Sequence, residues 1–160
     1  FMSGHYHFQA SPNWNGAIIN EGQIIVQQEG MAALVGNNVV NNGEIIANAG
    51  TVILGASKKF TVDFTGDQLI QFEVGGEVDH YAKDQHGNDL DAAVKNSGSV
   101  ITKAGKVIMT AQAAGAVLDR AINMSGVVEA KSVGVKNGEI ILAAIPAFSL
   151  DVPTLKNVVN

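Results

Sequence analysis

The feature of this sequence that most constrains its fold is a short internal repeat. The string Ile-Ile-Asn-Glu-Gly-Gln-Ile-Ile at 18–25 returns as Val-Val-Asn-Asn-Gly-Glu-Ile-Ile at 39–46 and as Val-Lys-Asn-Ser-Gly-Ser-Val-Ile at 94–101. The shared pattern is Asn-x-Gly-x-Ile/Val, and looser copies follow at 122–128 and 135–140. Self-similarity of this kind is typical of proteins built from stacked units, so it outweighs local propensity.

Each copy of the repeat has the pattern of short strands. Ile45 and Ala47, then Val52 and Leu54, alternate as in a strand with one buried face. Asn and Gly between the strands tolerate the left-handed backbone that bends require. A unit of about 21 residues cannot bury its apolar face alone, so successive units must stack. The sequence therefore predicts an all-β chain folded as a parallel β-helix, or β-solenoid, of roughly six or seven turns.

Stacking makes specific predictions about rows of side chains, because parallel strands lie about 4.8 Å apart with equivalent residues in register. One interior row is predicted to contain Ile24, Ile45 and Val100. One structural turn ladder, hydrogen-bonded to neighbouring backbone, is predicted to contain Asn20, Asn41 and Asn96. A leucine-rich repeat has a similar period, but its Leu-x-x-Leu-x-Leu framework is missing here.

Composition limits the function. The chain has 160 residues, 46% hydrophobic and 16% charged, with a net charge of -5 and no cysteine. The length fits one domain over residues 1–160. There is no Lys/Arg cluster, so no nucleic-acid partner is expected. No run of about 20 apolar residues predicts a membrane-spanning helix, and a chain that begins at Phe1 reads as a processed or excised piece.

The repeat is interrupted between its second and third full copies. Asn41 and Asn96 are 55 positions apart, so an insertion is predicted at about 58–91. Its first part reads as an extra-helical hairpin with strands at 60–64 and 69–74, and its second part as a long polar loop. A further irregular stretch, 112–120, is compatible with a helical turn or a loop.

The polar loop is the predicted place for binding, since loops on a rigid scaffold commonly carry function. Its candidate binding residues are Asp84, His86, Asn88, Asp89 and Asp91. Their spacing does not match an EF-hand, so a solvated turn is favoured over a calcium site, and no metal or cofactor is expected. His5 and His7 lie on one strand face and are interpreted as surface or stacking residues.

Four strings, in order along nearly the whole chain, resemble the filamentous haemagglutinin family of exoproteins exported by two-partner secretion. They are Phe-Met-Ser-Gly-His-Tyr-His-Phe at 1–8, the segment 39–47, the segment 50–56 leading into 62–67, and the segment 122–130. The resemblance implies a right-handed β-helix with extra-helical strands, an outer-membrane two-partner-secretion transporter as partner, and location at the surface of a Gram-negative bacterium or outside it. The family's Asn-Pro-Asn motifs are absent, and the matching strings are structural, so no adhesive residue is transferred.

No catalytic residues are predicted. Polysaccharide lyases and hydrolases built on parallel β-helices need converging carboxylates, or a basic residue beside a cation, on one sheet face, and the repeated strands show neither. The expected function is that of a non-catalytic adhesin or extracellular-matrix scaffold segment with a host-cell or matrix glycan as candidate partner. The alternatives are the shaft of a contact-dependent toxin-delivery exoprotein and a structural filament subunit that self-associates end to end.

Overall fold

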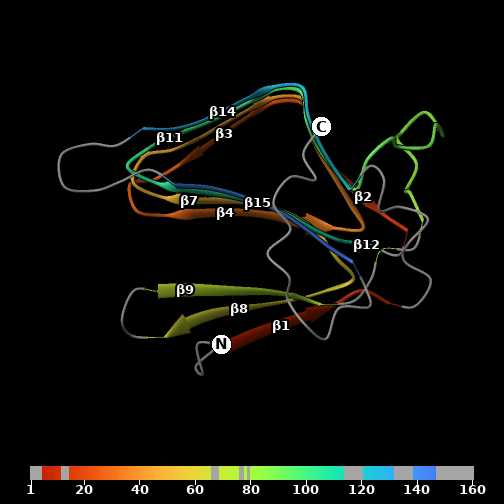
Figure 1. The fold of residues 1–160 in the computed structure, drawn as a ribbon, viewed down its shortest axis with the longest axis horizontal. Coiled ribbons are helices and arrows are strands. Elements are labelled where there is room, and N and C mark those ends of the chain that lie inside the picture. The colour runs from red at the N-terminus through yellow and green to blue at the C-terminus, as the bar shows by residue number, and fades with distance from the viewer. Residues whose placement is uncertain are drawn as a thin grey trace.

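The computed structural model describes residues 5–11, 15–65, 69–75, 78, 80–113, 121–131 and 139–146. These residues form an all-β structure of three parallel sheets and one antiparallel sheet, without helix (Figure 1). Within them there is accordingly no helix of the length and apolarity needed to cross a membrane.

The three parallel sheets are named B, C and D, and each has four strands. Sheet B contains β2 (Ala17–Asn20), β5 (Asn38–Asn41), β10 (Val94–Asn96) and β13 (Ile122–Met124). Sheet C contains β3 (Gln23–Val26), β6 (Glu44–Ala47), β11 (Ser99–Lys103) and β14 (Val127–Lys131). Sheet D contains β4 (Met31–Gly36), β7 (Thr51–Ala56), β12 (Lys106–Ala113) and β15 (Glu139–Pro146).

The chain visits sheets B, C and D in the same order four times. The described residues therefore make four passes, whereas the sequence predicts six or seven turns of about 21 residues for the whole chain with the insertion already allowed for. The passes differ in length, since more residues separate β10 from β13 than separate β2 from β5. The number of turns in the whole chain stays a prediction. Of the stretch 112–120, whose sequence is compatible with a helical turn or a loop, residues 112 and 113 belong to strand β12, and residues 114–120 lie outside the described residues. Residues 132–138, which include part of the last repeat copy, lie outside them too.

The core lies between the three parallel sheets. The predicted interior row is present: Ile24 pairs in register with Ile45, and Ile45 with Val100. Ile45 and Val100 are fully buried, and Ile24 on the outermost strand packs against them. Val52, Leu54, Val107 and Met109 complete this core from sheet D. The alternation seen in the sequence thus selects the inward face of each strand.

The glycines of the repeat allow backbones to approach closely. A Cβ at Gly43, Gly98 or Gly126 would collide with the backbone of the glycine one pass earlier, whereas a Cβ at Gly22 would meet nothing within 4 Å. These glycines are not the left-handed residues that the sequence predicted for the bends. Between sheets C and D that conformation belongs to the residues just before a glycine, namely Glu29, Ala49 and Ala104.

The predicted hairpin is present and belongs to the antiparallel sheet. Strands β8 (Lys59–Thr65) and β9 (Leu69–Gly75) are antiparallel, and β1 (His5–Gln9) pairs with the other edge of β8, which the sequence did not indicate. This three-stranded sheet, named A, lies over the outer face of sheet D (Figure 1). Ile53, an outward residue of β7, is consequently buried.

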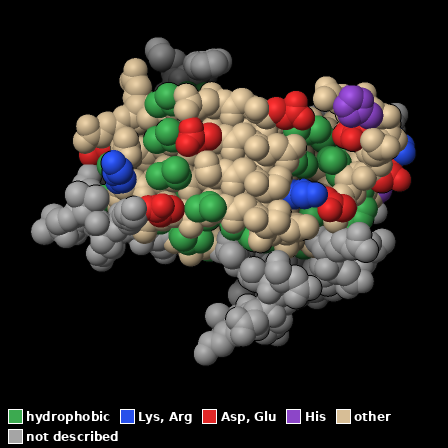
Figure 2. Space-filling view, turned by 90° about the horizontal axis from the view of Figure 1, so that it is seen from above, with side chains coloured by type: hydrophobic (Ala, Val, Ile, Leu, Met, Phe, Trp, Pro, Cys, Tyr) green, Lys and Arg blue, Asp and Glu red, His purple; other side chains and the backbone are tan. Residues whose placement is uncertain are grey.

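Sheet C carries an outward row of aliphatic side chains instead. Ile25 pairs in register with Ile46, and Ile46 with Ile101. Ile25 is 67% exposed and the other two are partly exposed. Figure 2 views the molecule from this side and shows hydrophobic side chains gathered among acidic ones. Within the described part of the chain, the outer face of sheet C thus lacks a layer like the one over sheet D.

Candidate functional site

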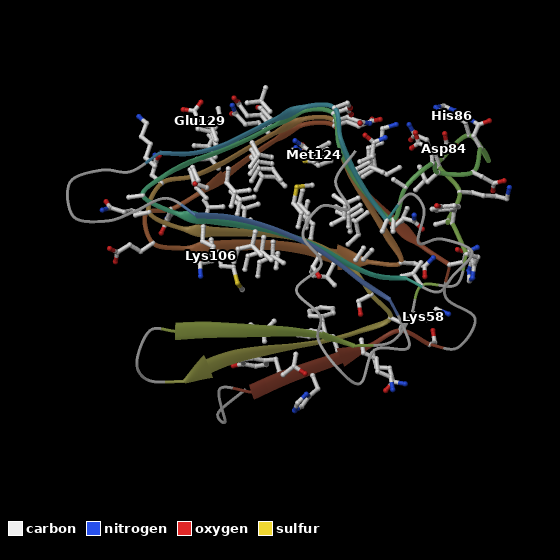
Figure 3. All side chains as sticks on the ribbon, viewed as in Figure 1. Lys58, Asp84, His86, Lys106, Met124 and Glu129 are labelled. Carbon is white, nitrogen blue, oxygen red and sulfur yellow. The ribbon has the colours of Figure 1, made fainter. Side chains whose placement is uncertain are left out.

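The candidate site is the segment between β9 and β10, called the excursion below, which contains the predicted polar loop. The two ends of this excursion are buried in the core. Val78, Ala82, Ala92 and Ala93 are fully buried, although they flank a polar loop. Small and β-branched apolar residues at both ends therefore hold the excursion against sheet B. The loop projects from one end of the molecule, where Asp84 and His86 lie well apart from Met124 and Glu129 (Figure 3).

Asn38, at the start of β5, fastens the two ends of this loop together. Its Oδ1 accepts a hydrogen bond from the Ala82 N–H at 2.7 Å, and its Nδ2 donates one to the Ala92 carbonyl oxygen at 2.7 Å. The side chain is fully buried, so both bonds replace water that the amide has lost. One asparagine side chain therefore holds the two ends of the loop, at Ala82 and Ala92, close to each other.

Asn37 makes a related contact. Its Nδ2 donates to the His80 carbonyl oxygen at 3.1 Å, while its buried Oδ1 has no hydrogen-bond partner. Sequence reasoning missed both asparagines because they precede the repeat pattern. The available signal was the register position, since Asn38 pairs with Ala17 and the equivalent residue before β10 is Ala93. A polar residue at a register position that other strands fill with alanine indicates that its side chain has a hydrogen-bond partner nearby in space.

The tip of the loop is ordered by Asp84. Its carboxylate accepts hydrogen bonds from the His86 N–H at 2.8 Å, the Asn88 N–H at 2.8 Å and Asn88 Nδ2 at 3.1 Å. The Asn88 side chain, followed by the Asn88 and His86 backbone, lowers the pKa of Asp84 below its ordinary value of 3.8. Gly87, with φ of 83°, supplies the left-handed residue of the turn. The Asp84 carboxylate thus stabilises the turn through hydrogen bonds with other residues of the loop.

The two remaining acidic candidates pair with lysines. Lys83 Nζ lies 2.7 Å from Asp89 Oδ1, and Lys95 Nζ lies 3.0 Å from Asp91 Oδ2. His86 is exposed at the tip. The five predicted residues lie on one loop, and the carboxylates of Asp84, Asp89 and Asp91 accept hydrogen bonds from protein donors. Among the described residues, no group of three or more His, Cys, Asp or Glu side chains is arranged to hold a metal ion.

The predicted asparagine row forms a hydrogen-bonded ladder between sheets B and C. Asn20 Nδ2 donates to Asn41 Oδ1 at 2.7 Å, and Asn41 Nδ2 donates to Asn96 Oδ1 at 2.7 Å. Asn96 Nδ2 then donates to the Val127 carbonyl oxygen at 3.2 Å, because Met124 occupies the next ladder position. Asn41 and Asn96 are fully buried. The ladder binds the turns to each other, with no group directed at a ligand.

His5 and His7 both lie on β1. His7 Nδ1 is 2.8 Å from Thr61 Oγ1 across the β1–β8 pair, so this histidine has a cross-strand partner. The side chain of His5 lies outside the described residues.

Comparison with known proteins gives one informative similarity. No family model matches the chain. The chain is 31% identical over 135 residues to a heme/hemopexin-binding protein of Haemophilus influenzae, an alignment that covers 81% of this chain and 13% of the relative. The chain thus spans about an eighth of the length of that curated relative.

Proposed function

We propose that this chain is a segment of a right-handed parallel β-helix in a secreted exoprotein of the filamentous haemagglutinin family, where it acts as a non-catalytic adhesin or scaffold. The partner for export is an outer-membrane two-partner-secretion transporter, and the location is the surface or surroundings of a Gram-negative bacterium. Residues 1–160 form one such unit with the insertion at 58–91.

The observation that carries the proposal is the repeated order of sheets B, C and D. Equivalent residues stack from pass to pass, as in the ladder from Asn20 to Asn41 and Asn96. Crossovers between parallel strands of one sheet are right-handed in about 98% of cases, which supports the proposed hand. Stacked passes make a stiff body, and the loop with Asp84 and His86 is held out from it by Asn38.

Binding of haem or hemopexin is the second candidate, and it is favoured by the 31% identity to a protein of that name. Because the alignment covers 13% of that relative, the activity of the whole protein transfers only as a proposal. On this reading the exposed elements of the segment would contact haem or hemopexin. Neither the toxin-delivery shaft nor the filament subunit is favoured by a specific contact.

The test compares the chain with a variant in which 84–91 is replaced by a short Gly-Ser linker. Beads coated with either protein are incubated with epithelial cells and with a glycan array, and in parallel both proteins are titrated with haem and with hemopexin. We expect the native chain to attach to cells or glycans and the variant to lose most of this attachment. Circular dichroism and melting should be unchanged, since the replaced residues lie outside the core.

Attachment that is equal for both proteins would overturn the assignment of binding to the loop. Hemopexin or haem binding without attachment would favour the second candidate over the first. An experimental structure with left-handed passes would overturn the proposed β-helix hand.

A further inference from the structure

A pocket of about 340 Å³ lies where sheet A meets the outer edge of sheet D, away from the loop. The ends of β1 and β4, the connection from β7 to β8 and the start of β8 contribute to its wall. Its lining residues are Phe8, Gln9, Ala10, Ser11, Val35, Gly36, Ser57, Lys58 and Phe60. The volume falls at the lower end of the roughly 300–1,000 Å³ of ligand sites, which is suitable for one large side chain.

The apolar part of the pocket is an aromatic pair. The rings of Phe8 and Phe60 stack with centroids 4.5 Å apart and an interplanar angle of 9°. Phe8 is 47% exposed, although it belongs to the large hydrophobic side chains that folding normally buries. Val35, on the outward face of β4, is buried opposite. A half-exposed ring beside a buried aliphatic residue offers apolar surface to a further apolar group.

Two of the pocket's lining residues, Val35 and Gln9, lie on strands at the edges of their sheets. Among the residues that the structure describes, β4 pairs with β7 alone, and Val35 is opposite Gly55. The Thr51 N–H bonds to the Gly30 carbonyl oxygen and the Ser57 N–H to the Gly36 carbonyl oxygen, so even-numbered residues of β4 bond toward β7. The N–H and C=O of Val35 therefore point away from β7, along the outer edge of the sheet.

The same reasoning applies to β1, the edge strand of sheet A. The Ala10 N–H bonds directly across to the Lys58 carbonyl oxygen at 2.9 Å, and Phe8 is opposite Phe60 in the same register. Hydrogen-bonded and non-bonded positions alternate in an antiparallel pair. The N–H and C=O of Gln9 consequently point away from β8, and Gln9 lines the pocket.

We propose that this pocket binds an extended peptide segment, whose backbone pairs with the edge at Val35 or Gln9 and whose bulky apolar side chain occupies the space beside Phe8. Strand addition joins main-chain hydrogen bonds, which supply affinity, to a side-chain pocket, which supplies specificity. Both elements meet at this position. The inference does not depend on the proposed adhesin function, because neither the loop nor its binding enters the argument.

A peptide fits these groups better than a sugar. Edge strands present donors and acceptors in the alternation of a β-ladder, and a peptide matches that alternation. A pyranose would stack on Phe8 but would leave the directional groups of Val35 and Gln9 to be met by hydroxyls alone. A sugar ligand is therefore the alternative outcome of the test.

The probe is the acetylated and amidated peptide Lys-Thr-Val-Phe-Val-Thr-Lys, titrated into the full chain and followed by NMR shifts of the Val35 and Gln9 amides. Three comparisons accompany it: the same peptide with an N-methylated Phe, the same peptide with Ala in place of Phe, and maltohexaose. We expect saturable binding that weakens about tenfold for each altered peptide, equivalent to about 1.4 kcal/mol.

The protein variant is Phe8→Ala, matched by Ile25→Ala on the uncovered face of sheet C. Both residues are large, apolar and about half exposed or more, so each variant is expected to keep its fold by circular dichroism. Peptide binding should weaken about fivefold or more in Phe8→Ala and stay within about twofold in Ile25→Ala. The proposal would be overturned if the peptide did not bind, or if N-methylation did not weaken its binding. It would also be overturned if both variants lost binding equally, or if maltohexaose alone bound.

Discussion

Asn41 Nδ2 donates a 2.7 Å hydrogen bond to Asn96 Oδ1, and this bond joins residues 55 positions apart. The two asparagines are opposite each other in register on β5 and β10, and both are fully buried. The whole insertion, including sheet A's hairpin and the candidate loop, lies between them in sequence. The ladder therefore joins the passes before and after the insertion directly. The core is continuous from β5 to β10, and the excursion projects from it.

Replacing Asn41 by Ala should destabilise the protein more than any surface change. The substitution leaves Asn20 Nδ2 and Asn96 Oδ1 without their ladder partners, and an unsatisfied buried polar group costs about 1–3 kcal/mol. We expect urea denaturation to show a loss of about 2–4 kcal/mol. The control is Ser97→Ala, which removes an exposed hydrogen bond to Asn42 and should cost about 0.5 kcal/mol or less. Equal losses would contradict a structural ladder.

Two glycines of one column should respond differently to alanine. A Cβ at Gly98 would overlap the Gly43 carbonyl oxygen, which is backbone and cannot move aside, whereas a Cβ at Gly22 meets nothing within 4 Å. Gly98→Ala should cost about 2–3 kcal/mol or prevent folding. Gly22→Ala should change the free energy of unfolding by about 0.5 kcal/mol or less. Thermal melting of the two variants side by side makes the comparison, and similar melting temperatures would show that the passes are not packed this closely.

Asn38→Ala should loosen the loop's base. The Ala82 N–H and the Ala92 carbonyl oxygen would lose their buried partner, at a cost of about 2 kcal/mol. Hydrogen exchange should accelerate at the Ala82 amide and limited proteolysis should increase within 80–92. The matched variant Asn88→Ala alters the exposed tip and should leave exchange at Ala82 unchanged. Unaltered exchange in Asn38→Ala would mean that the apolar residues alone hold the excursion.

The tip should lose order in acid. The folded-state pKa of Asp84 lies below its ordinary value of 3.8, so its ordering contribution is fully present above that value and is lost as the pH falls through the lowered folded pKa. Amide shifts of His86 and Asn88, followed from about pH 6 to about pH 2, should move together in that window. In Asp84→Asn the transition should be absent. A transition at or above the ordinary value would argue against carboxylate-held structure.

A divalent cation should not be required for folding. Asp84 is engaged by protein donors, and Asp89 and Asp91 are paired with lysines, so a cation would have to displace existing partners. Addition of EDTA should leave the melting temperature within about 1 °C, since binding of a ligand to the native state would otherwise raise it. A marked fall in melting temperature that calcium reverses would show that the loop is a cation site.

The sequence by itself determined the strands, their inward faces and the rows from Asn20 to Asn96 and from Ile24 to Val100. These features follow from local alternation and from a repeat whose copies must occupy equivalent positions. It also placed the hairpin, because two apolar strand-like runs flank a turn-rich segment. Such properties depend on residues close in sequence or identical between copies.

Only the tertiary structure decided how the insertion is held. Asn38 reaches residues 44 and 54 positions away, and β1 joins β8 with His7 and Thr61 54 positions apart. The carboxylates of Asp89 and Asp91 pair with lysines. The physical reason is that a polar side chain takes its role from whichever donors or acceptors the packed core places beside it. For Asn38 and β1 those partners come from distant strands and the register of the sheets, which no single segment encodes, whereas Asp89 and Asp91 find lysines six and four positions away.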